Sequence, residues 1–458
     1  MIKIAHLSDT HIGYEAYKAV SGSGENQRSV DFAKAFVQVV DEIIASDPDI
    51  VIHAGDVADR TQIPVRLMLL IRQQFSRLAG IRPNGTRRQL VVIAGNHEIP
   101  RNKKEACFLE LFKGLPGVHI YTKDYEVLRF NNENIYAENY PKVLDNLAIH
   151  CLPHDALKYV DFDDVKPVKN MKNILVSHGV AGGSELYVRS LGREFAIPTT
   201  VLARDWDYGA LGHWHKQGPI NILSVGGAKQ HNVSRVKQLS SHRQVERDED
   251  GFTPGVDYLL PQSTDSGKIW YSGSTENSGF GDLMDNGIKR GWLLVTLPKF
   301  TEAKIERKYT SIRTMFRLPD FDATTKTPDE ITKGLIEALK DSNTFGAVIG
   351  QIVNNVSSDT WSLVDIAKIR RHASQAMHYE LTVRYKNMKL NTTGSILNDT
   401  SLHIDDLLKI SAERLLTEEN REIAIEISQK TLKNIFDKYD TITNETGLLN
   451  NDVQEVKS

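Results

Sequence analysis

The sequence predicts an α/β fold, because strand-like and helix-like segments alternate along its N-terminal part and polar residues follow most of the strand-like runs. Strand, helix, strand order is typical of a parallel sheet covered by helices. With 458 residues, the chain exceeds one ordinary domain. We therefore expect two or three units, the first of which carries the α/β layers.

Each N-terminal element has a simple signal. Apolar runs at residues 2–7, 50–53 and 90–94 indicate strands, and the last of them leads into the polar stretch GNHE. Apolar residues recur at helical spacing over residues 30–44, and a second helix begins near Pro64, a residue that suits a first helical turn. GNHE thus lies at the C-terminal edge of the predicted sheet, where open α/β sheets bind their ligands.

Five more apolar runs indicate strands, at residues 146–154, 173–179, 207–215, 268–274 and 291–297. Several of them also end in polar residues, so we expect a shared rim of polar side chains. Between residues 218 and 267 the chain is hydrophilic and lacks apolar periodicity, which predicts a surface insertion.

The pattern changes after residue 300. A helix at residues 330–340 and strands at 347–356 and 379–385 indicate a small α+β domain, and the end of the chain has the pattern of amphipathic helices. The apolar faces of these last helices either pack on their own domain or are offered to a partner. Three domains are therefore predicted, at residues 1–300, 301–392 and 400–458.

The composition limits the classes of function that the protein can have. Apolar residues make up 40% and charged residues 25%, as in soluble globular proteins, and the net charge is only −3. Nucleic-acid contacts would therefore come from local basic patches. Cys107 and Cys151 lack the spacing of a metal or redox motif and are expected to be buried thiols. Without a signal peptide or a run of about 20 apolar residues, we expect a cytoplasmic, nucleoid-associated protein.

Side chains with metal-binding chemistry recur at the predicted strand ends. In chain order they are Asp9 and His11, Asp56, Asn96 and His97, His178, and His213 and His215. Taken singly, each is more often a cap or a satisfied polar group, but the whole series favours a shared site. Carboxylates and imidazoles without thiolates suit manganese, iron or zinc. Two cations about 3.5 to 4 Å apart need a shared anionic ligand, which an aspartate supplies and an imidazole does not.

The order D-x-H, GD, GNHE, H and GHxH resembles that of the calcineurin-like metallophosphoesterases. This resemblance implies a layered sandwich, with helices around two mixed sheets, and a pair of divalent metals. It implies that Asp9, His11, Asp56 and His215 hold one metal and that Asp56, Asn96, His178 and His213 hold the other, with Asp56 as the bridge. His97 would not bind a metal, but would donate a proton to the leaving oxygen while a metal-activated water attacks a phosphodiester.

A narrower resemblance covers about residues 1–300. HLSDTHIG at the start and IWYSGSTENSGFGD at residues 269–282 are similar to the SbcD-type nucleases of DNA double-strand-break repair, which usually have proline where this chain has Ser272. The resemblance implies a manganese-dependent 3′-5′ exonuclease and endonuclease that forms a homodimer and acts with an SbcC-type coiled-coil ABC ATPase. Residues 301–392 would cap the DNA, and the C-terminal helices would bind the ATPase.

Basic residues near the predicted site and in the predicted cap are candidates for DNA contacts, although charge clusters are usually solvated faces. The candidates are Arg87, Arg88, Arg101, Lys103, Lys104, Arg370 and Arg371. Two other functions stay open on the same scaffold. One is a phosphomonoesterase or cyclic-nucleotide phosphodiesterase, and the other is a scaffold that bridges an ATPase and DNA with minor catalysis.

Overall fold

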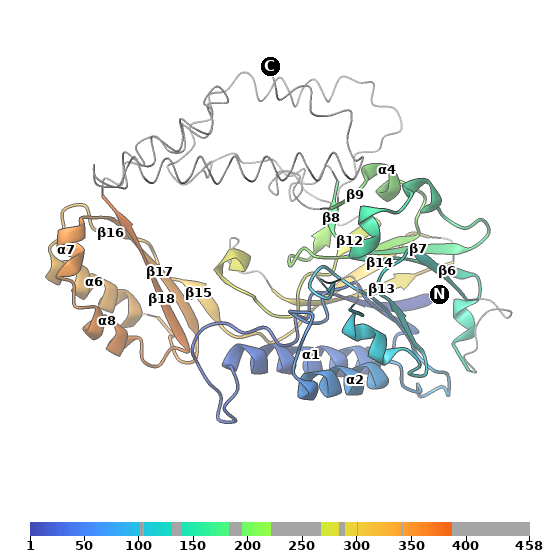
Figure 1. The fold of residues 1–458 in the computed structure, drawn as a ribbon, viewed down its shortest axis with the longest axis horizontal. Helices are drawn as coiled ribbons and strands as arrows, with labels where there is room; N and C mark the ends of the chain where they lie inside the picture. Colours follow the sequence, from blue (N-terminus) through green and yellow to red (C-terminus); the bar gives the residue numbers. More distant parts are fainter. Residues whose placement is uncertain are drawn as a thin grey trace, which may run out of the picture. The chain divides into compact units, whose positions relative to one another are not determined.

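A computed structural model of the protein describes residues 1–100, 102, 105–130, 139–182, 195–220, 267–283, 289–299, 301–340 and 342–386. Most of the predicted insertion, the predicted C-terminal helices and three candidate DNA-binding residues (Arg101, Lys103 and Lys104) lie outside these residues. Within them, the chain forms two large mixed sheets and a smaller α+β unit (Figure 1). The predicted fold class is confirmed for the part of the chain that the structure describes.

The first sheet has the strand order β14-β13-β1-β2-β3-β4. Its strands are β1 Ile2–Leu7, β2 Ile50–His53, β3 Gln89–Ile93, β4 Val118–Tyr121, β13 Gly291–Leu297 and β14 Lys304–Tyr309. Strands β1 to β4 run parallel, with Ile4 opposite Ile50, and β13 pairs antiparallel with β1. The parallel strands β1, β2 and β3 therefore end at the same edge of the sheet.

The second sheet has the strand order β11-β12-β10-β7-β6-β5. Its strands are β5 Glu126–Phe130, β6 Leu147–Leu152, β7 Lys172–His178, β10 Tyr208–Gly212, β11 Gly218–Pro219 and β12 Ile269–Tyr271. Strands β6, β7, β10 and β12 are parallel, and the two edge strands are antiparallel to their neighbours. Strands β7 and β10 thus also share one C-terminal edge.

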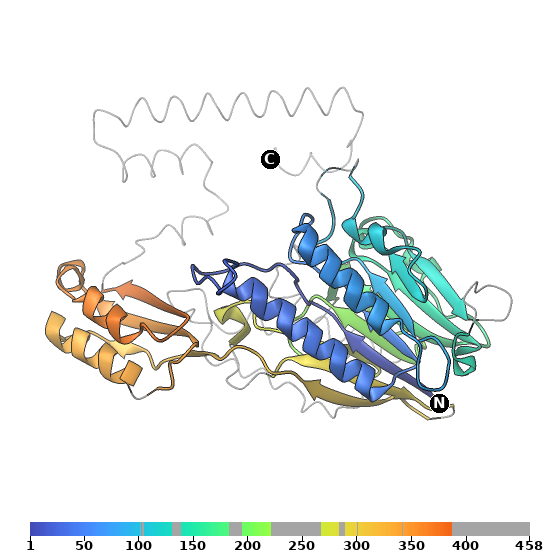
Figure 2. The ribbon, with the colours of Figure 1, turned by 90° about the horizontal axis from the view of Figure 1, so that it is seen from below.

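The two sheets pack face to face around an apolar core that contains Ile52 and Ile93 from the first sheet and Ile149 and Val176 from the second. On the other face of the first sheet lie helices α1 Gln27–Ser46 and α2 Val65–Leu78, which run side by side (Figure 2). Strands β2 and β3 are therefore buried on both faces, which explains their uninterrupted apolar sequences.

Short elements complete the core. Helix α1 begins after Asn26, whose side chain accepts a hydrogen bond from the backbone N–H of Arg28 (3.0 Å), and ends where Asp47 adopts a left-handed conformation. The remaining short helices and strands are η1 Phe108–Phe112, η2 Lys142–Leu144, η3 His154–Lys158, η4 Phe162–Asp164, η5 Phe280–Leu283, α4 Thr199–Leu202, β8 Val180–Ala181 and β9 Ala196–Ile197. Residues of η3 and α4 cover the outer face of the second sheet.

The small α+β unit has a core of its own. It contains strands β15 Met315–Arg317, β16 Phe321–Asp322, β17 Val348–Val356 and β18 His378–Tyr385, and helices α6 Pro328–Lys340, α7 Ser358–Ser362 and α8 Ile366–His372. By its contacts, this unit nevertheless belongs with the two large sheets to one compact unit, residues 1–384. The three-domain division of the chain stays a prediction.

Cys107 and Cys151 are both buried, unpaired thiols, as expected. Burial raises the pKa of the Cys107 thiol to about 12, so it is inert at neutral pH. Among the described residues, no helix is both long enough and apolar enough to cross a bilayer.

Candidate metal centre

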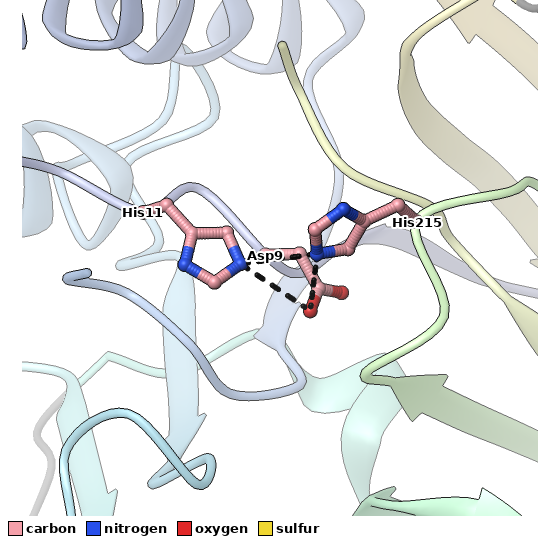
Figure 3. A group of neighbouring side chains, drawn as sticks. All are labelled: Asp9, His11 and His215. Atoms are coloured by element: carbon pink, nitrogen blue, oxygen red, sulfur yellow. Dashed lines mark hydrogen bonds and ion pairs between the residues drawn. The ribbon is translucent and has the colours of Figure 1, made fainter. Parts of the chain in front are cut away.

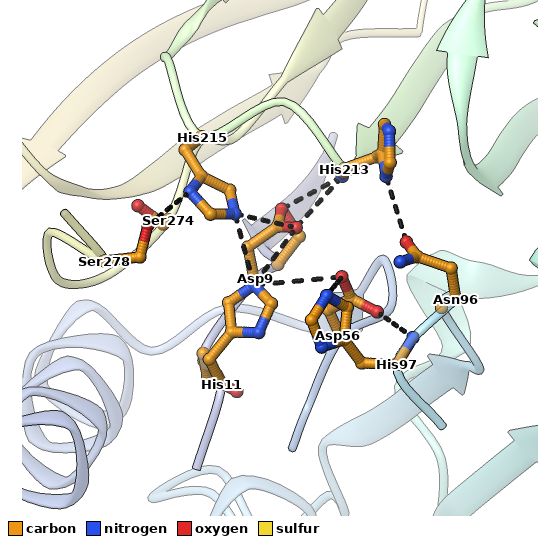
Figure 4. A network of polar contacts seen from close by, with 12 residues as sticks. Asp9, His11, Asp56, Asn96, His97, His213, His215, Ser274 and Ser278 are labelled. Atoms are coloured by element: carbon orange, nitrogen blue, oxygen red, sulfur yellow. Dashed lines mark hydrogen bonds and ion pairs between the residues drawn. The ribbon is translucent and has the colours of Figure 1, made fainter. Parts of the chain in front are cut away.

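The residues predicted as metal ligands lie together where strands of both sheets end (Figure 4). Asp9 and His11 follow β1, Asp56 follows β2, Asn96 follows β3, His178 is the last residue of β7, and His213 and His215 follow β10. Because the C-terminal edges of both sheets meet at this place, residues from five strands reach one site. The side chains form two groups.

The first group consists of Asp9, His11 and His215, whose candidate ligand atoms lie within 4.8 Å of one another (Figure 3). The Nε2 atoms of His11 and His215 are 3.2 Å apart, and Asp9 Oδ1 lies 4.0 and 3.9 Å from them. The backbone N–H of His213 donates to both carboxylate oxygens of Asp9, at 3.1 Å each. Three donor atoms therefore converge on one point.

The second group consists of Asp56, His178 and His213, with Asn96 beside them. His178 Nε2 lies 3.2 Å from Asp56 Oδ2 and 3.0 Å from Asn96 Oδ1. His213 Nδ1 lies 3.0 Å from the same Asn96 oxygen. Nitrogen and oxygen atoms again converge, now with the amide oxygen of Asn96 among them.

Asp56 lies between the two groups. Its Oδ2 atom is 3.2 Å from His178 Nε2 in the second group and 3.8 Å from His11 Nε2 in the first. The side chain is almost fully buried, and the carboxylate is held by a hydrogen bond of 3.0 Å from the backbone N–H of His97 to Oδ1. A carboxylate in this position is suited to bridge two cations.

The donor set fits divalent cations. His178 Nδ1 donates to the carbonyl of Ala54 at 2.7 Å, which leaves a lone pair on Nε2 in the neutral ring. That lone pair faces acceptor oxygens, so a positive charge is needed between them. Burial lowers the pKa of His178, but the Asp56 carboxylate more than offsets this effect and raises the pKa to about 9. Without a metal, the ring therefore binds a proton at the place where a cation would sit.

The backbone is bent at the ligands. Asp9, His11, Asp56 and His213 all have positive φ angles, of 52°, 41°, 53° and 99°. Non-glycine residues seldom adopt such conformations, which cost about 1 to 3 kcal/mol each and cluster at functional sites. At the strand ends they turn the chain sharply and aim the side chains at a common point.

Glycine is required beside two of these ligands. A Cβ atom on Gly95 would lie 2.1 Å from Asp56 Oδ1, and one on Gly55 would lie 2.3 Å from His178 Nδ1. Gly55 also has a φ of 93°, which glycine alone adopts readily. The glycines of GD and GNHE thus let the loops approach the ligands closely.

His97 borders the centre. Its side chain is 37% exposed, and its Nδ1 donates to the backbone carbonyl of Asp59 at 2.6 Å. Its Nε2 lies 3.9 Å from Asp56 Oδ2, and its ring contacts that of His11 edge to face. His97 belongs to neither ligand group, and instead forms a third cluster with His11 and Asp59.

Glu98 was not singled out from the sequence, but it shapes the centre. The side chain is fully buried, and its oxygens accept backbone hydrogen bonds from Asp56 (3.2 Å), Ala58 (2.7 Å) and Gly95 (2.8 Å). Burial and the nearby Asp56 carboxylate raise the pKa of Glu98 to about 8. Glu98 therefore fixes the two ligand-bearing loops to each other.

Ser272 also reaches the centre. Its Oγ lies 2.7 Å from Ser8 Oγ, and Ser8 Oγ donates to Asp9 Oδ2. Both serines are fully buried. The serine that replaces the usual proline thus joins a short hydrogen-bonded chain that ends on a predicted ligand.

A cleft of about 1250 Å³ adjoins the centre at Asn96. Phe195 and Tyr159 line it and are 46% and 53% exposed, and Lys158 lies over the Phe195 ring, with Nζ 5.5 Å from the ring centroid. His154, also on its wall, donates from Nδ1 to the carbonyl of His178 at 3.0 Å. The cleft offers apolar, cationic and hydrogen-bonding groups next to the predicted ligands.

The candidate DNA-binding arginines differ in exposure. Arg370 and Arg371 are exposed in the last turn of α8, and Arg87 is half-buried with Nη1 donating to the carbonyl of Ala79 at 3.0 Å. Arg88 is 3% exposed, and its guanidinium donates to the carbonyls of Pro48 and Leu78 and to Asp47. A guanidinium enclosed in this way does not reach a DNA phosphate, which corrects the expectation for Arg88.

Comparison with known proteins identifies the class to which this fold and site belong. Residues 2–217 match the calcineurin-like phosphoesterase family. The match runs from the first strand past the last predicted ligand, so it includes every residue that the resemblance assigns to the two metals. The first resemblance drawn from the sequence is thereby confirmed.

Relatives found by sequence include archaeal proteins named DNA double-strand break repair protein Mre11. The protein of Methanococcus maripaludis is 26% identical over 249 residues, which cover 53% of this chain and 61% of the relative. That of Sulfolobus acidocaldarius is 24% identical over 268 residues, covering 56% and 63%. That of Methanocaldococcus jannaschii is 29% identical over 131 residues, covering 29% and 32%. The aligned part thus spans less than two thirds of these relatives, and Mre11 is the counterpart of the SbcD nucleases that the sequence resembles.

Proposed function

We propose that this chain is a metal-dependent phosphodiesterase that cleaves DNA, acting as a 3′-5′ exonuclease and endonuclease in double-strand-break processing. The observation that carries the proposal is the position of Asp56, whose carboxylate contacts a ligand group on each side. Phosphodiesterases that use two metals need such a shared ligand. The names of the Mre11 relatives support DNA as the substrate.

The residues of the first group and Asp56 would hold one cation, and Asp56 with Asn96, His178 and His213 would hold the other. When bound, two divalent cations, for which we propose manganese, lower the pKa of water and neutralise phosphate oxygens. The buried carboxylates fix the position of the ligand rings, and Glu98 and the glycines keep the loops in register.

His97 would donate the proton that the leaving oxygen needs. Its Nδ1–H is engaged by the Asp59 carbonyl, so Nε2 is the nitrogen available to a substrate. The exposed ring lies beside the centre without belonging to either ligand group. General-acid catalysis of this kind contributes about 10² to 10⁴ in rate.

DNA contacts are proposed for the exposed Arg370 and Arg371, for Arg87, and for Arg101, Lys103 and Lys104 outside the described residues. Phosphate contacts make binding depend steeply on salt, because counterions are released. Residues 301–392 would cap the DNA, as the second resemblance implies. The net charge of −3 makes this a local interaction and not a general attraction to polyanions.

The proposed partners are a second copy of the chain and an SbcC-type coiled-coil ABC ATPase, with the protein located at the nucleoid in the cytoplasm. The amphipathic pattern of residues 400–458 supports a docking role for this segment. A chain that ends after residue 395 should lose association with the ATPase and keep manganese-dependent hydrolysis. Association retained by the shortened chain would contradict the docking role.

A direct assay tests the activity. The purified full chain is incubated with manganese and either an end-labelled DNA duplex with single-stranded ends or p-nitrophenyl phosphate esters. We expect shortening of the duplex that requires manganese and is lost in Asp56→Asn. Cleavage of the small monoester alone would favour a phosphomonoesterase, and no cleavage of either substrate would favour a scaffold.

A further inference from the structure

We infer that a largely buried chain of ion pairs and hydrogen bonds couples the small α+β unit (residues 315–385) to His215, so that the docking of this unit controls the affinity for the cation that His215 would hold. The inference rests on the metal centre proposed above. It assigns a positioning role to Arg313, Glu276 and Arg290, which lie outside both ligand groups.

The first contact is made by Arg313, just before β15. Its Nη1 donates to the carbonyl of Gly346, in the loop that leads into β17, at 2.6 Å. Its Nε and Nη2 both donate to the carboxylate of Asp31 on α1, the latter at 2.6 Å. Its backbone N–H donates to Glu276 Oε2 at 3.0 Å. Arg313 therefore connects the α+β unit to Asp31 on α1 and to Glu276.

The second contact is made by Arg28, which is fully buried on α1. Its Nη1 donates to Asp31 at 2.8 Å, and its Nη2 donates to Glu276 Oε1 at 3.3 Å and to the carbonyl of Asn277. Arg28 thus joins the same two carboxylates that Arg313 contacts. Arg28, Asp31 and Glu276 are joined through their side chains, and Arg313 closes the arrangement with its guanidinium on Asp31 and its backbone N–H on Glu276.

The third contact reaches the predicted ligand. Arg290 Nε donates to Asn277 Oδ1 at 2.7 Å, and Arg290 Nη1 donates to the backbone carbonyl of His215. The N–H of Ser274 donates to the same carbonyl at 3.1 Å, and Ser278 Oγ lies 3.4 Å from His215 Nδ1 (Figure 4). The loop that carries Glu276 and Asn277 therefore holds both the backbone and the ring of His215.

Burial makes this chain of contacts stiff. Arg28, Glu276, Asn277 and Arg290 are each at most 2% exposed. A buried charge that loses its partner is costly, so a shift of one member favours a matching shift of the next. Displacement of Arg313 would therefore move the loop at Glu276 and change the position of His215.

Coupling of this kind is reciprocal. If docking of the α+β unit strengthens metal binding by some factor, metal binding strengthens docking by the same factor. Typical coupling between sites amounts to about 5-fold to 150-fold in affinity. Both directions can be measured on the full chain without a DNA substrate.

The test uses Arg313→Gln in the full-length protein. Arg313 is 21% exposed, so its loss is better tolerated than that of the buried Arg28. Free manganese is followed by electron paramagnetic resonance during titration. We expect two sites in both proteins, with one of them weakened by about 5-fold or more in the variant, and a partial recovery in Arg313→Lys, which keeps the charge.

The matched control is Arg82→Gln. Arg82 pairs with two acids, Asp47 at 2.9 Å and Asp49 at 2.5 Å, and its side chain is 9% exposed, but it is not part of this network. Its removal should leave both manganese affinities unchanged. Equal losses of manganese affinity in the two variants would indicate general destabilisation and would overturn the inference. Unchanged manganese affinities in Arg313→Gln would overturn it as well.

Hydrogen exchange tests the reverse direction. The amide of Arg313 donates to Glu276, so its exchange reports on docking. Manganese should slow this exchange in the wild type and not in Arg313→Gln, and equal exchange with and without the metal in the wild type would overturn the inference. Because neither readout involves DNA, a failed nuclease assay and a failed coupling are distinguishable.

Discussion

The two ring nitrogens of His97 face different partners, and this division is the basis of its proposed task. Nδ1 is engaged by the Asp59 carbonyl, while Nε2 faces the centre. We expect His97→Ala to slow hydrolysis of DNA by about 10² to 10⁴. Manganese content, measured by elemental analysis, should stay at the wild-type value because His97 belongs to neither ligand group. A variant that keeps full activity would contradict the proton-donor role.

The shared position of Asp56 leads to a second prediction. Bound cations stabilise the folded chain by an amount that grows with their concentration, about 2.7 kcal/mol at 100 times the dissociation constant. The melting temperature should therefore rise with added manganese in the wild type. In Asp56→Asn, where both ligand groups lose a carboxylate contact, most of this rise should vanish. A rise of wild-type size in the variant would argue against a bridge.

The predicted metal ligands could be picked out from the sequence because each of them follows or ends a strand. The predicted ligands have carboxylate, amide or imidazole groups at strand ends, and parallel strands bring such ends together. Glu98 and Ser272 also follow strands, but their roles depend on which backbone amides and hydroxyls surround them, and the sequence does not reveal this. Arg88 was misassigned since its burial against Asp47 and two carbonyls is a tertiary property.

At the scale of elements, the apolar runs of β1, β2 and β13 were predicted with their observed bounds. Strand β14 was missed because its sequence, KIERKY, is mostly charged and lacks an apolar run. The antiparallel pairing of β1 with β13 joins residues almost 300 positions apart, so local patterns do not reveal it. Long-range pairing entered the prediction only through the family resemblance.

The GNHE loop that follows β3 permits a test of close packing. Gly95→Ala places a Cβ atom 2.1 Å from Asp56 Oδ1, so the loop or the carboxylate must shift. We expect manganese affinity, measured by calorimetric titration, to fall by at least about 10-fold, because misplacing one ligand removes about 1.4 kcal/mol or more of binding.

Gly22→Ala is the matched control for this variant. Nothing lies within 4 Å of a Cβ atom built on Gly22, and its φ is not positive. Its manganese affinity and its melting temperature should equal those of the wild type. Equal affinities in Gly95→Ala and Gly22→Ala would show that the loop adapts without cost.

The whole molecule should be sensitive to acid, because it buries several neutral histidines. Burial lowers the pKa of His6 and His53 to about 3 and that of His150 to about 4, from 6.5. An unfolded chain binds protons at these rings below about pH 6.5, whereas the folded chain does not. The stability they contribute is therefore complete above that pH and is lost as the pH falls toward the folded values.

His150 offers a test far from the ligand groups. Its ring is fully buried in β6, 2.7 Å from the Tyr125 hydroxyl and 3.0 Å from Asn173 Oδ1. Between about pH 7.5 and pH 5 it should account for a loss of about 2 kcal/mol in the free energy of unfolding. Urea unfolding in the presence of a chelator should show a smaller loss in His150→Gln, and an equal loss would contradict this assignment.

The charged composition of β14 has a consequence for the molecule as a whole. Within the described residues, β14 is an edge strand, since it pairs with β13 on one side and has no strand on the other. The side chains of its Lys304 and Glu306 are exposed. Open strand edges are templates on which other chains aggregate, and charged side chains, lysine above all, hinder such growth. The charged residues of β14, which kept it from being predicted by its apolar pattern, thus also protect the protein from amyloid-like stacking.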